Sequence, residues 1–375
     1  MTTPRSTPLR ARHENLGASF TDFGGWMMPV RYTSDLAEHR AVREAAGLFD
    51  ISHMAQFSVT GADREAFLAA ALVLDPAKLA LSKAKYSMIL APTGGIIDDL
   101  IVTRNAEDEF LVVANAGNRE PVREAFAERA EGFDVSVTEL DAALIAVQGP
   151  SAQEILENTP GLDHDDALAM GHTLDSLRYY TAMGMRFGDG AVLISRTGYT
   201  GEDGFELSVD TADAEALWDA LLAAGQSFGL VPAGLAARDT LRLEAGMPLY
   251  GHELSLDIVP AQAGLGRVVP LATKDTDFVG RAALESGVAT DAPVLVGLVS
   301  DGRRAGRAGY GVFDGDEKVG EVTSGALSPT LGHPIAMAFV SPRVSEPGTE
   351  LSLDVRGTRI PATVTTLPFY KRTAK

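Results

Sequence analysis

The sequence contains no cysteine. This absence excludes disulfide bonds, thiolate zinc sites, cysteine-held iron–sulfur clusters and cysteine nucleophiles. The sequence also has no run near the roughly 20 apolar residues that a membrane-spanning helix needs. Its first residues, MTTPRSTPLRARHENLG, lack the apolar core of a secretory signal. We therefore predict a cytoplasmic protein that does not act at a membrane.

Positive charge is scarce as well. The 32 Lys and Arg residues face 51 Asp and Glu residues, which gives a formal net charge of −19. Such a chain repels phosphate groups, so we predict no nucleic-acid partner. Its 375 residues, 45% of them hydrophobic, are typical of a globular protein of two or three domains.

Several catalytic and metal-binding motifs are missing. The sequence has no G-x-x-x-x-G-K-[ST], H-E-x-x-H, G-x-S-x-G or EF-hand pattern. Its seven histidines lack metal-ligand spacing, and we interpret His53 and His252 as structural histidines whose ring nitrogens are satisfied. The sequence therefore predicts no metal site and no acyl-enzyme chemistry.

The hydrophobic pattern predicts a mixture of helices and strands. We expect helices at 33–47, 63–72, 119–130, 211–225 and 235–245, and strands at 49–59, 86–90, 96–103, 109–114, 144–148, 185–187, 191–196 and 205–209. Helical periodicity ends near residue 285. The segments 351–355 and 360–364 then alternate around an Arg356-Gly357 turn and predict a hairpin, with Pro361 indicating an edge strand. The predicted class is α+β with a β-barrel-like end.

An acidic pair stands out in IIDDLIV, residues 96–102. In a strand, Asp98 and Asp99 point to opposite faces, and both faces are predicted to be buried because apolar residues flank the pair. A buried carboxylate needs hydrogen-bond donors or changes its pKa. Periodicity alone leaves open whether either aspartate is functional or a structural acid bonded to backbone N–H groups or an arginine.

Two further stretches carry charged residues. Glu206 lies in FELSVD and faces away from its apolar neighbours, so the pattern alone predicts an exposed strand residue. Arg238 and Arg242 are one helical turn apart in AARDTLRLEAG, followed by Glu244. Such a helix face is usually solvated or salt-bridged.

Together these segments make the chain resemble the aminomethyltransferase (T-protein) family of the glycine cleavage system. The matching segments run through nearly the whole chain in the family's order. They are FGGWMMPVRY (23–32), GLFDISHM (47–54), GGIIDDLIV (94–102), IAVQGP (145–150), TGYTGEDGFE (197–206), GLAARDTLRLEAGMPLYGHE (234–253) and TSGALSPTLG (323–332).

The resemblance implies a reaction and a fold. The reaction transfers a one-carbon unit from the aminomethyl-loaded lipoyl arm of the H-protein to tetrahydrofolate, releases ammonia and forms 5,10-methylenetetrahydrofolate, with no metal. The fold has two α+β lobes and a C-terminal antiparallel β-barrel in a cloverleaf arrangement around the folate. We expect one lobe from residues 1–50 and 141–284, a second from 51–140, and the barrel from 285–375.

The resemblance also implies roles for individual residues. Asp98 matches the family's key acid, and would either move a proton or orient the folate amines. Glu206 matches the pterin-binding glutamate and Arg238 the folate-site arginine. Asn115 is expected to bind the same ring. Tyr86 and Met54 are expected to be apolar walls of the folate site, or alternatively core residues.

The sequence departs from the family at the folate tail and leaves rival functions to weigh. Arg267 stands where the family often has an aromatic residue, so Tyr370 or Arg372 is a candidate for the tail contact. The nearest rival is a folate-dependent demethylase of the same fold that acts on a methylated sulfonium or amine. A non-catalytic folate-binding relative in iron–sulfur assembly would carry a K-G-C-Y-type cysteine, which this chain lacks.

Overall fold

The computed structural model describes residues 3–372, which divide into two compact units. The first unit comprises the chain up to Leu68, Asp75–Tyr86 and Leu100–Arg238, and the second comprises Ala69–Leu74, Ser87–Asp99 and the chain from Asp239 onward. Asp98 and the tail-contact candidates Tyr370 and Arg372 therefore belong to the second unit. The other predicted site residues belong to the first, namely Met54, Tyr86, Asn115, Glu206 and Arg238. Residues 1–2 and 373–375, at the ends of the predicted ranges 1–50 and 285–375, lie outside the described residues.

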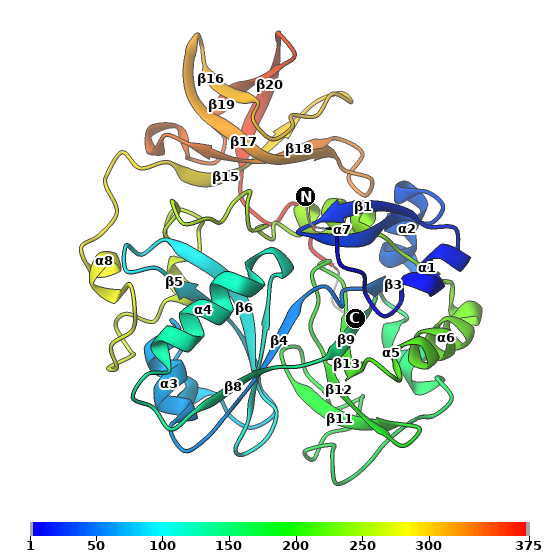
Figure 1. The fold of residues 1–375 in the computed structure, drawn as a ribbon. Coiled ribbons are helices and arrows are strands. Elements are labelled where there is room, and N and C mark those ends of the chain that lie inside the picture. Colours follow the sequence, from blue (N-terminus) through cyan, green and yellow to red (C-terminus); the bar gives the residue numbers. More distant parts are fainter. Residues whose placement is uncertain (1–2, 373–375) are drawn as a thin grey trace. The chain divides into compact units, whose positions relative to one another are not determined.

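A seven-stranded sheet forms the centre of the first unit (Figure 1). Its order is β10 (Leu162–Asp163), β11 (Ala182–Phe187), β12 (Gly190–Ser195), β13 (Gly204–Asp210), β9 (Ala142–Gln148), β3 (Ala46–Asp50) and β14 (Leu230–Pro232). All neighbours pair antiparallel except β3 and β14, which are parallel. The alternating apolar residues of β9, β12 and β13 point into one shared core.

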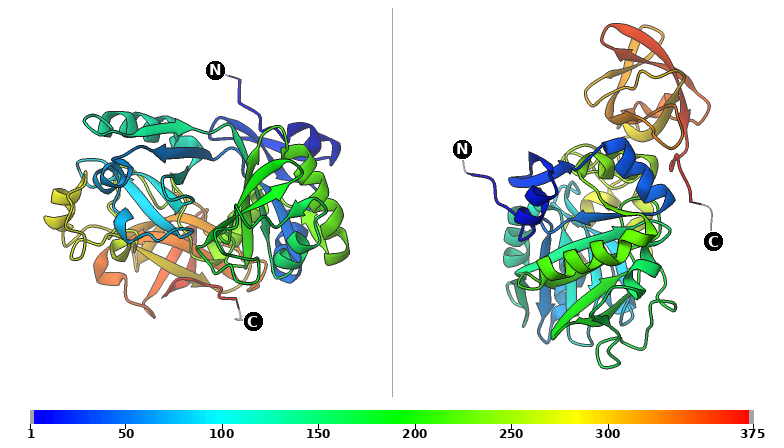
Figure 2. Two further views of the ribbon diagram at one scale, coloured as in Figure 1. Left: turned by 90° about the horizontal axis from the view of Figure 1, so that it is seen from below. Right: turned by 90° about the vertical axis from the view of Figure 1, so that its right-hand side faces the viewer.

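Helices α5 (Ala152–Glu157) and α6 (Ala214–Gly225) cover a face of this sheet, and α6 lies across it in Figure 2. Leu217, Trp218 and Leu221 recur at helical spacing and are fully buried against the strands. The predicted helix 211–225 is thus confirmed, except that it begins three residues later. A two-stranded sheet, β1 (Ser19–Phe23) and β2 (Trp26–Arg31), accompanies α1 (Arg10–Asn15) and α2 (Asp35–Glu44).

The second sheet has the order β5 (Ala84–Leu90), β6 (Ile96–Arg104), β7 (Phe110–Ala114), β4 (Ala55–Thr60) and β8 (Ser136–Glu139). Its helices are α3 (Arg64–Ala71) and α4 (Arg119–Arg129), and Phe126 of α4 contacts Phe57 and Phe67 edge to face. The single strand predicted over 49–59 is wrong. The chain leaves β3 at Asp50 and enters β4 of the other sheet at Ala55. A pattern of interspersed apolar and polar residues without glycine or proline therefore spans two strands.

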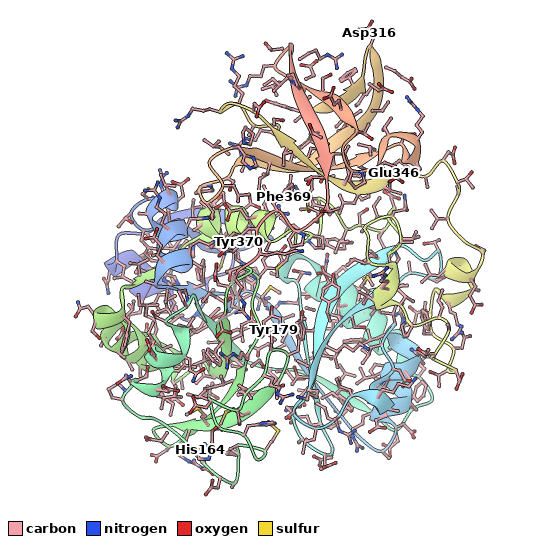
Figure 3. The ribbon with its side chains drawn as sticks, turned by 180° about the vertical axis from the view of Figure 1, so that it is seen from behind. His164, Tyr179, Asp316, Glu346, Phe369 and Tyr370 are labelled. Atoms are coloured by element: carbon pink, nitrogen blue, oxygen red, sulfur yellow. The ribbon has the colours of Figure 1, made fainter. Side chains whose placement is uncertain are left out.

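Six antiparallel strands of the second unit close into a barrel. They are β15 (Val294–Ser300), β18 (Pro334–Val340), β17 (Glu317–Leu327), β16 (Gly311–Asp314), β19 (Glu350–Val355) and β20 (Thr358–Thr365). Figure 3 labels Asp316 at the tip of the β16–β17 hairpin. The predicted α+β class with a C-terminal antiparallel barrel is confirmed.

The predicted C-terminal hairpin is also confirmed, since β19 and β20 meet at Arg356 and Gly357, both with positive φ. The edge-strand prediction for Pro361 is wrong, because β20 pairs with β19 on one side and β15 on the other. Pro361 is tolerated because the β15 pairing extends only over Ala362–Thr365.

Helix α7 (Leu235–Glu244) ends in two buried charged side chains that bind the loops and strands of the barrel. The Arg242 guanidinium donates to Ser324 Oγ at 2.8 Å and to Glu253 Oε2 at 3.2 Å. The Glu244 carboxylate accepts from the Ser328 hydroxyl and from Thr330. The salt-bridged alternative is therefore confirmed for Arg242, which pairs with Glu253 and Asp239 within a largely buried polar network.

Removing the Arg242 charge should destabilise the second unit strongly. Glu253 is fully buried and its Oε1 already lacks a partner among the described residues, so loss of Arg242 leaves an uncompensated carboxylate. We expect Arg242→Met to lower the free energy of unfolding by about 3–5 kcal/mol in urea. Arg343→Ala, which removes an exposed arginine paired with Asp314, should cost less than about 1 kcal/mol. Equal losses of unfolding free energy in Arg242→Met and Arg343→Ala would contradict this stabilising role of Arg242.

Candidate active site

The acidic pair lies at the start of β6, in the second unit. Asp98 is fully buried, whereas Asp99 on the opposite face is half-buried. The predicted split onto two faces is confirmed, but the prediction that both faces are buried is wrong for Asp99. Gly94 has φ +85° in the turn before the strand, a conformation that glycine adopts without strain. Asp98 is therefore the aspartate of this pair that the fold removes from water.

Glu206 lies in β13 of the first unit and is half-buried rather than fully exposed. Thr197 Oγ1 donates to Glu206 Oε2 at 2.5 Å. Because each carboxylate oxygen has two lone pairs, this bond leaves both oxygens able to accept a further donor. The strand pairing of Glu206 with Ser195 and Ala146 holds its backbone.

Arg238 lies in the first turn of α7, and its guanidinium stands 4.7 Å from the centroid of the Tyr199 ring. Burial lowers the pKa of the Arg238 guanidinium, while the negative charge of Glu206 opposes that shift. An arginine remains charged in this setting. The structure thus places the predicted residues Glu206 and Arg238 in one electrostatic cluster.

Two tyrosines of this cluster escaped sequence reasoning. Tyr199 lies within the TGYTGEDG stretch, whose glycines were considered but whose aromatic residue was not. Tyr180 has φ +59°, and its backbone is held by Arg196 O and Ala84 N. Burial raises the pKa of the Tyr180 phenol, and so does the charge of Glu206. Non-glycine residues with positive φ cluster at functional sites, but no local sequence pattern predicts this conformation of Tyr180.

Met54 and Asn115 lie together at one end of the second sheet. Ala55 pairs with Ala114 in antiparallel register. Met54, which precedes Ala55, is therefore a neighbour of Asn115, which follows Ala114. Arg119 Nη2 donates to Met54 O at 3.3 Å, which holds this segment. Tyr86, half-buried in β5, belongs to the same sheet and the same unit. The roles expected for these three residues stay predictions.

His53 adjoins Met54 and is buried. Its ring Nδ1 has no hydrogen-bond partner among residues 3–372, so the prediction of satisfied ring nitrogens is wrong for His53. For His252 the structure is consistent with that prediction, because its Nδ1 lies 2.8 Å from Thr323 O. Burial, and then the positive charge of Arg238, lower the pKa of the His53 imidazole to about 4. The ring is therefore neutral at pH 7.

A pH dependence of stability follows from His53. Its pKa in the folded protein, about 4, lies below the value of about 6.5 expected in the unfolded chain, so the unfolded state binds more protons between these values. Stability from this residue is complete above pH 6.5 and is lost as the pH falls. Between pH 7 and pH 5 we expect wild type to lose about 2 kcal/mol more unfolding free energy than His53→Gln. Parallel pH profiles in urea denaturation would refute the assignment.

Two kinds of feature, a metal-binding group and a membrane-spanning helix, are absent from the described residues 3–372. No group of three or more His, Asp or Glu side chains is arranged to hold a metal ion. No helix in this range is both long and apolar enough to cross a membrane.

Comparison with known proteins gives consistent matches over the whole chain. Residues 9–273 match the GCVT N-terminal domain, and residues 294–371 match the glycine cleavage T-protein C-terminal barrel domain. The chain is 54% identical to aminomethyltransferases of Cutibacterium acnes, covering 99% of this chain and 100% of the relative, and of Streptomyces avermitilis, covering 98% of each. The crystal structure of glycine cleavage system aminomethyltransferase T from Bartonella henselae superposes with a TM-score of 0.87 at 39% identity, covering 98% of each chain.

These matches define an enzyme of the transferase class with an α+β body and a C-terminal barrel. The chain belongs to the aminomethyltransferase, or glycine cleavage T-protein, family. The family resemblance and the aminomethyltransferase activity predicted from the sequence are thereby confirmed.

Proposed function

We propose that this aminomethyltransferase takes its one-carbon unit from an aminomethyl group on the lipoyl arm of the H-protein and gives it to tetrahydrofolate. The carbon loses its bonds to sulfur and to the amine nitrogen and gains bonds to folate N5 and N10. The two protons released from N5 and N10 pass to the lipoyl sulfur and to the departing ammonia. The products are a dihydrolipoyl carrier, ammonia and 5,10-methylenetetrahydrofolate.

The cluster of Glu206, Arg238 and Tyr199 supports folate as the acceptor. The 2-amino and N3–H groups of a pterin form a planar pair of donors, and an ionised carboxylate accepts both. Thr197 holds one oxygen of that carboxylate through its hydroxyl. An aromatic ring and a guanidinium beside it suit a flat heterocycle with an anionic tail. This grouping in one compact unit is the observation that carries the proposal.

Asp98 supplies the key carboxylate of the reaction in this proposal and would either move a proton or orient the folate amines. A buried carboxylate near the folate amines stabilises positive charge on the carbon in transit and favours the nucleophilic form of the attacking nitrogen. Asn115 would add hydrogen bonds to the pterin, and Met54 and Tyr86 would form apolar walls. These roles rest on the family resemblance and on the burial and strand positions described above.

The carrier and the location are proposed on narrower grounds. The lipoylated H-protein follows from the glycine cleavage family to which the chain belongs. Cytoplasmic activity is predicted from the sequence and stays a prediction.

The one-carbon donor that the protein accepts tests the proposed function. Purified protein and tetrahydrofolate are mixed with aminomethyl-loaded lipoyl carrier in one reaction and with a methylated sulfonium in another. We expect ammonia and methylenetetrahydrofolate only from the carrier. Turnover of the sulfonium alone would select the demethylase and overturn the proposal.

A further inference from the structure

The loop of residues 247–258, here called the brace, holds the start of β6. Tyr250 donates its hydroxyl to Ile96 O at 3.2 Å. Ile96 N donates to Ser255 O at 3.0 Å and to Ile258 O at 3.2 Å. Both backbone polar groups of Ile96 are thus bound by the brace, which positions the first residue of the strand.

The turn before Ile96 fits directly against the same loop. A Cβ atom on Gly95 would lie 1.8 Å from Leu256 O, so no other residue fits at this position without moving the brace. The close approach of backbone to backbone leaves the turn little freedom. The brace therefore determines where the chain enters β6, two residues before Asp98.

The brace itself is anchored inside the second unit. Glu253 Oε2 accepts from Leu249 N at 2.9 Å and from Arg242 at 3.2 Å. Arg242 also donates to Met247 O at 3.3 Å, and His252 binds Thr323 O of β17. A loop held at its start and in its middle can support the strand that packs against it.

Tyr250, a side chain of the brace, is electrostatically linked to the acidic pair. Burial raises the pKa of the Tyr250 phenol, and the charges of Asp98 and Asp99 raise it further. The hydroxyl therefore stays protonated and remains a donor at neutral pH. Its ring packs with the apolar cluster that includes Ile96 and Leu254, and phenylalanine can preserve that packing.

We propose that Tyr250 is a positioning residue for Asp98. Its hydroxyl fixes the carbonyl of Ile96, and Ile96 and Asp98 lie on the same buried face of β6. Because Asp98 follows Ile96 by two residues in the same strand, the position of Ile96 determines where the Asp98 carboxylate lies. Loss of the hydroxyl lets the strand start shift and misplaces the acid. The inference rests on the proposed function in one respect, namely that Asp98 acts on the folate amines.

Tyr250→Phe tests the proposal, with Tyr310→Phe as the matched control, because Tyr310 is a half-buried tyrosine packed on the barrel core. We expect Tyr250→Phe to lower kcat about tenfold, since a small misplacement of a reacting group costs that much or more. The KM for tetrahydrofolate and the urea midpoint should stay near those of wild type. Unchanged kcat, or an equal loss in Tyr310→Phe, would overturn the proposal.

A double-substitution cycle separates positioning from a general structural effect. If Tyr250 acts through Asp98, Asp98→Asn combined with Tyr250→Phe should be as slow as Asp98→Asn alone. A further tenfold loss in the double variant would show that Tyr250 acts independently and would refute the inference. Near-normal turnover of Asp98→Asn alone would instead refute the proposed role of Asp98, so the two failures are distinguishable.

Discussion

Asp98→Asn should lose most of its turnover, by about 10²- to 10³-fold, while the protein still folds and binds tetrahydrofolate. Asparagine matches aspartate in shape, so the fully buried site of Asp98 stays filled. It removes the negative charge that would stabilise the carbon in transit and the basicity that would favour the attacking nitrogen. Steady-state kinetics with aminomethyl-loaded carrier, together with folate titration, measures the two effects separately.

Asp99→Asn is the matched control for this substitution. Asp99 lies on the opposite face of β6 and is half-buried, so we expect turnover within a few fold of wild type. If Asp99→Asn were inactive and Asp98→Asn near normal, the choice between the two aspartates would be reversed. If neither changed turnover, the acidic pair would have no part in the reaction.

Glu206→Ala should weaken tetrahydrofolate binding by at least about a hundredfold. Each hydrogen bond to a charged carboxylate contributes roughly 1.5–3 kcal/mol, and a bidentate contact with the pterin loses two such bonds. The substitution also leaves Arg238 without the carboxylate whose charge favours its ionised form. Calorimetric titration of tetrahydrofolate into the variant gives the affinity directly.

Glu215→Ala serves as the comparison for Glu206→Ala. Glu215 is a glutamate on helix α6 whose carboxylate is 42% exposed and lies 3.5 Å from Arg12, and removing it should leave folate affinity unchanged. An affinity of Glu206→Ala equal to that of Glu215→Ala would exclude Glu206 from the folate site.

The local sequence pattern was sufficient to predict the structure where a residue's environment depends on its immediate neighbours. The alternation in IIDDLIV placed Asp98 and Asp99 on opposite faces, and the Arg356-Gly357 pair predicted the hairpin turn that the structure contains. Prediction from the local sequence pattern failed where the chain passes from one sheet to the other. No glycine or proline between Asp50 and Ala55 marks the break between β3 and β4, and the residues of both strands are largely buried.

Long-range contacts explain what the sequence could not predict in the site. The strained backbone of Tyr180 depends on hydrogen bonds to Ala84 in β5 and to Arg196, which follows β12, and neither is a neighbour in the sequence. The contact between Tyr250 and Ile96 joins residues 154 positions apart. The choice of Asp98 over Asp99 came from the family resemblance, and the deeper burial of Asp98 is consistent with it.

A single turnover with isotope-labelled aminomethyl carrier tests the central claim most directly. The protein is mixed with tetrahydrofolate and a carrier whose aminomethyl carbon is labelled, and the labelled products are followed over time. We predict that the label moves into the bridge between folate N5 and N10, with one ammonia released per bridge, and that Asp98→Asn slows both events together. Label that stays on the carrier, or ammonia released without a labelled folate bridge, would contradict the account.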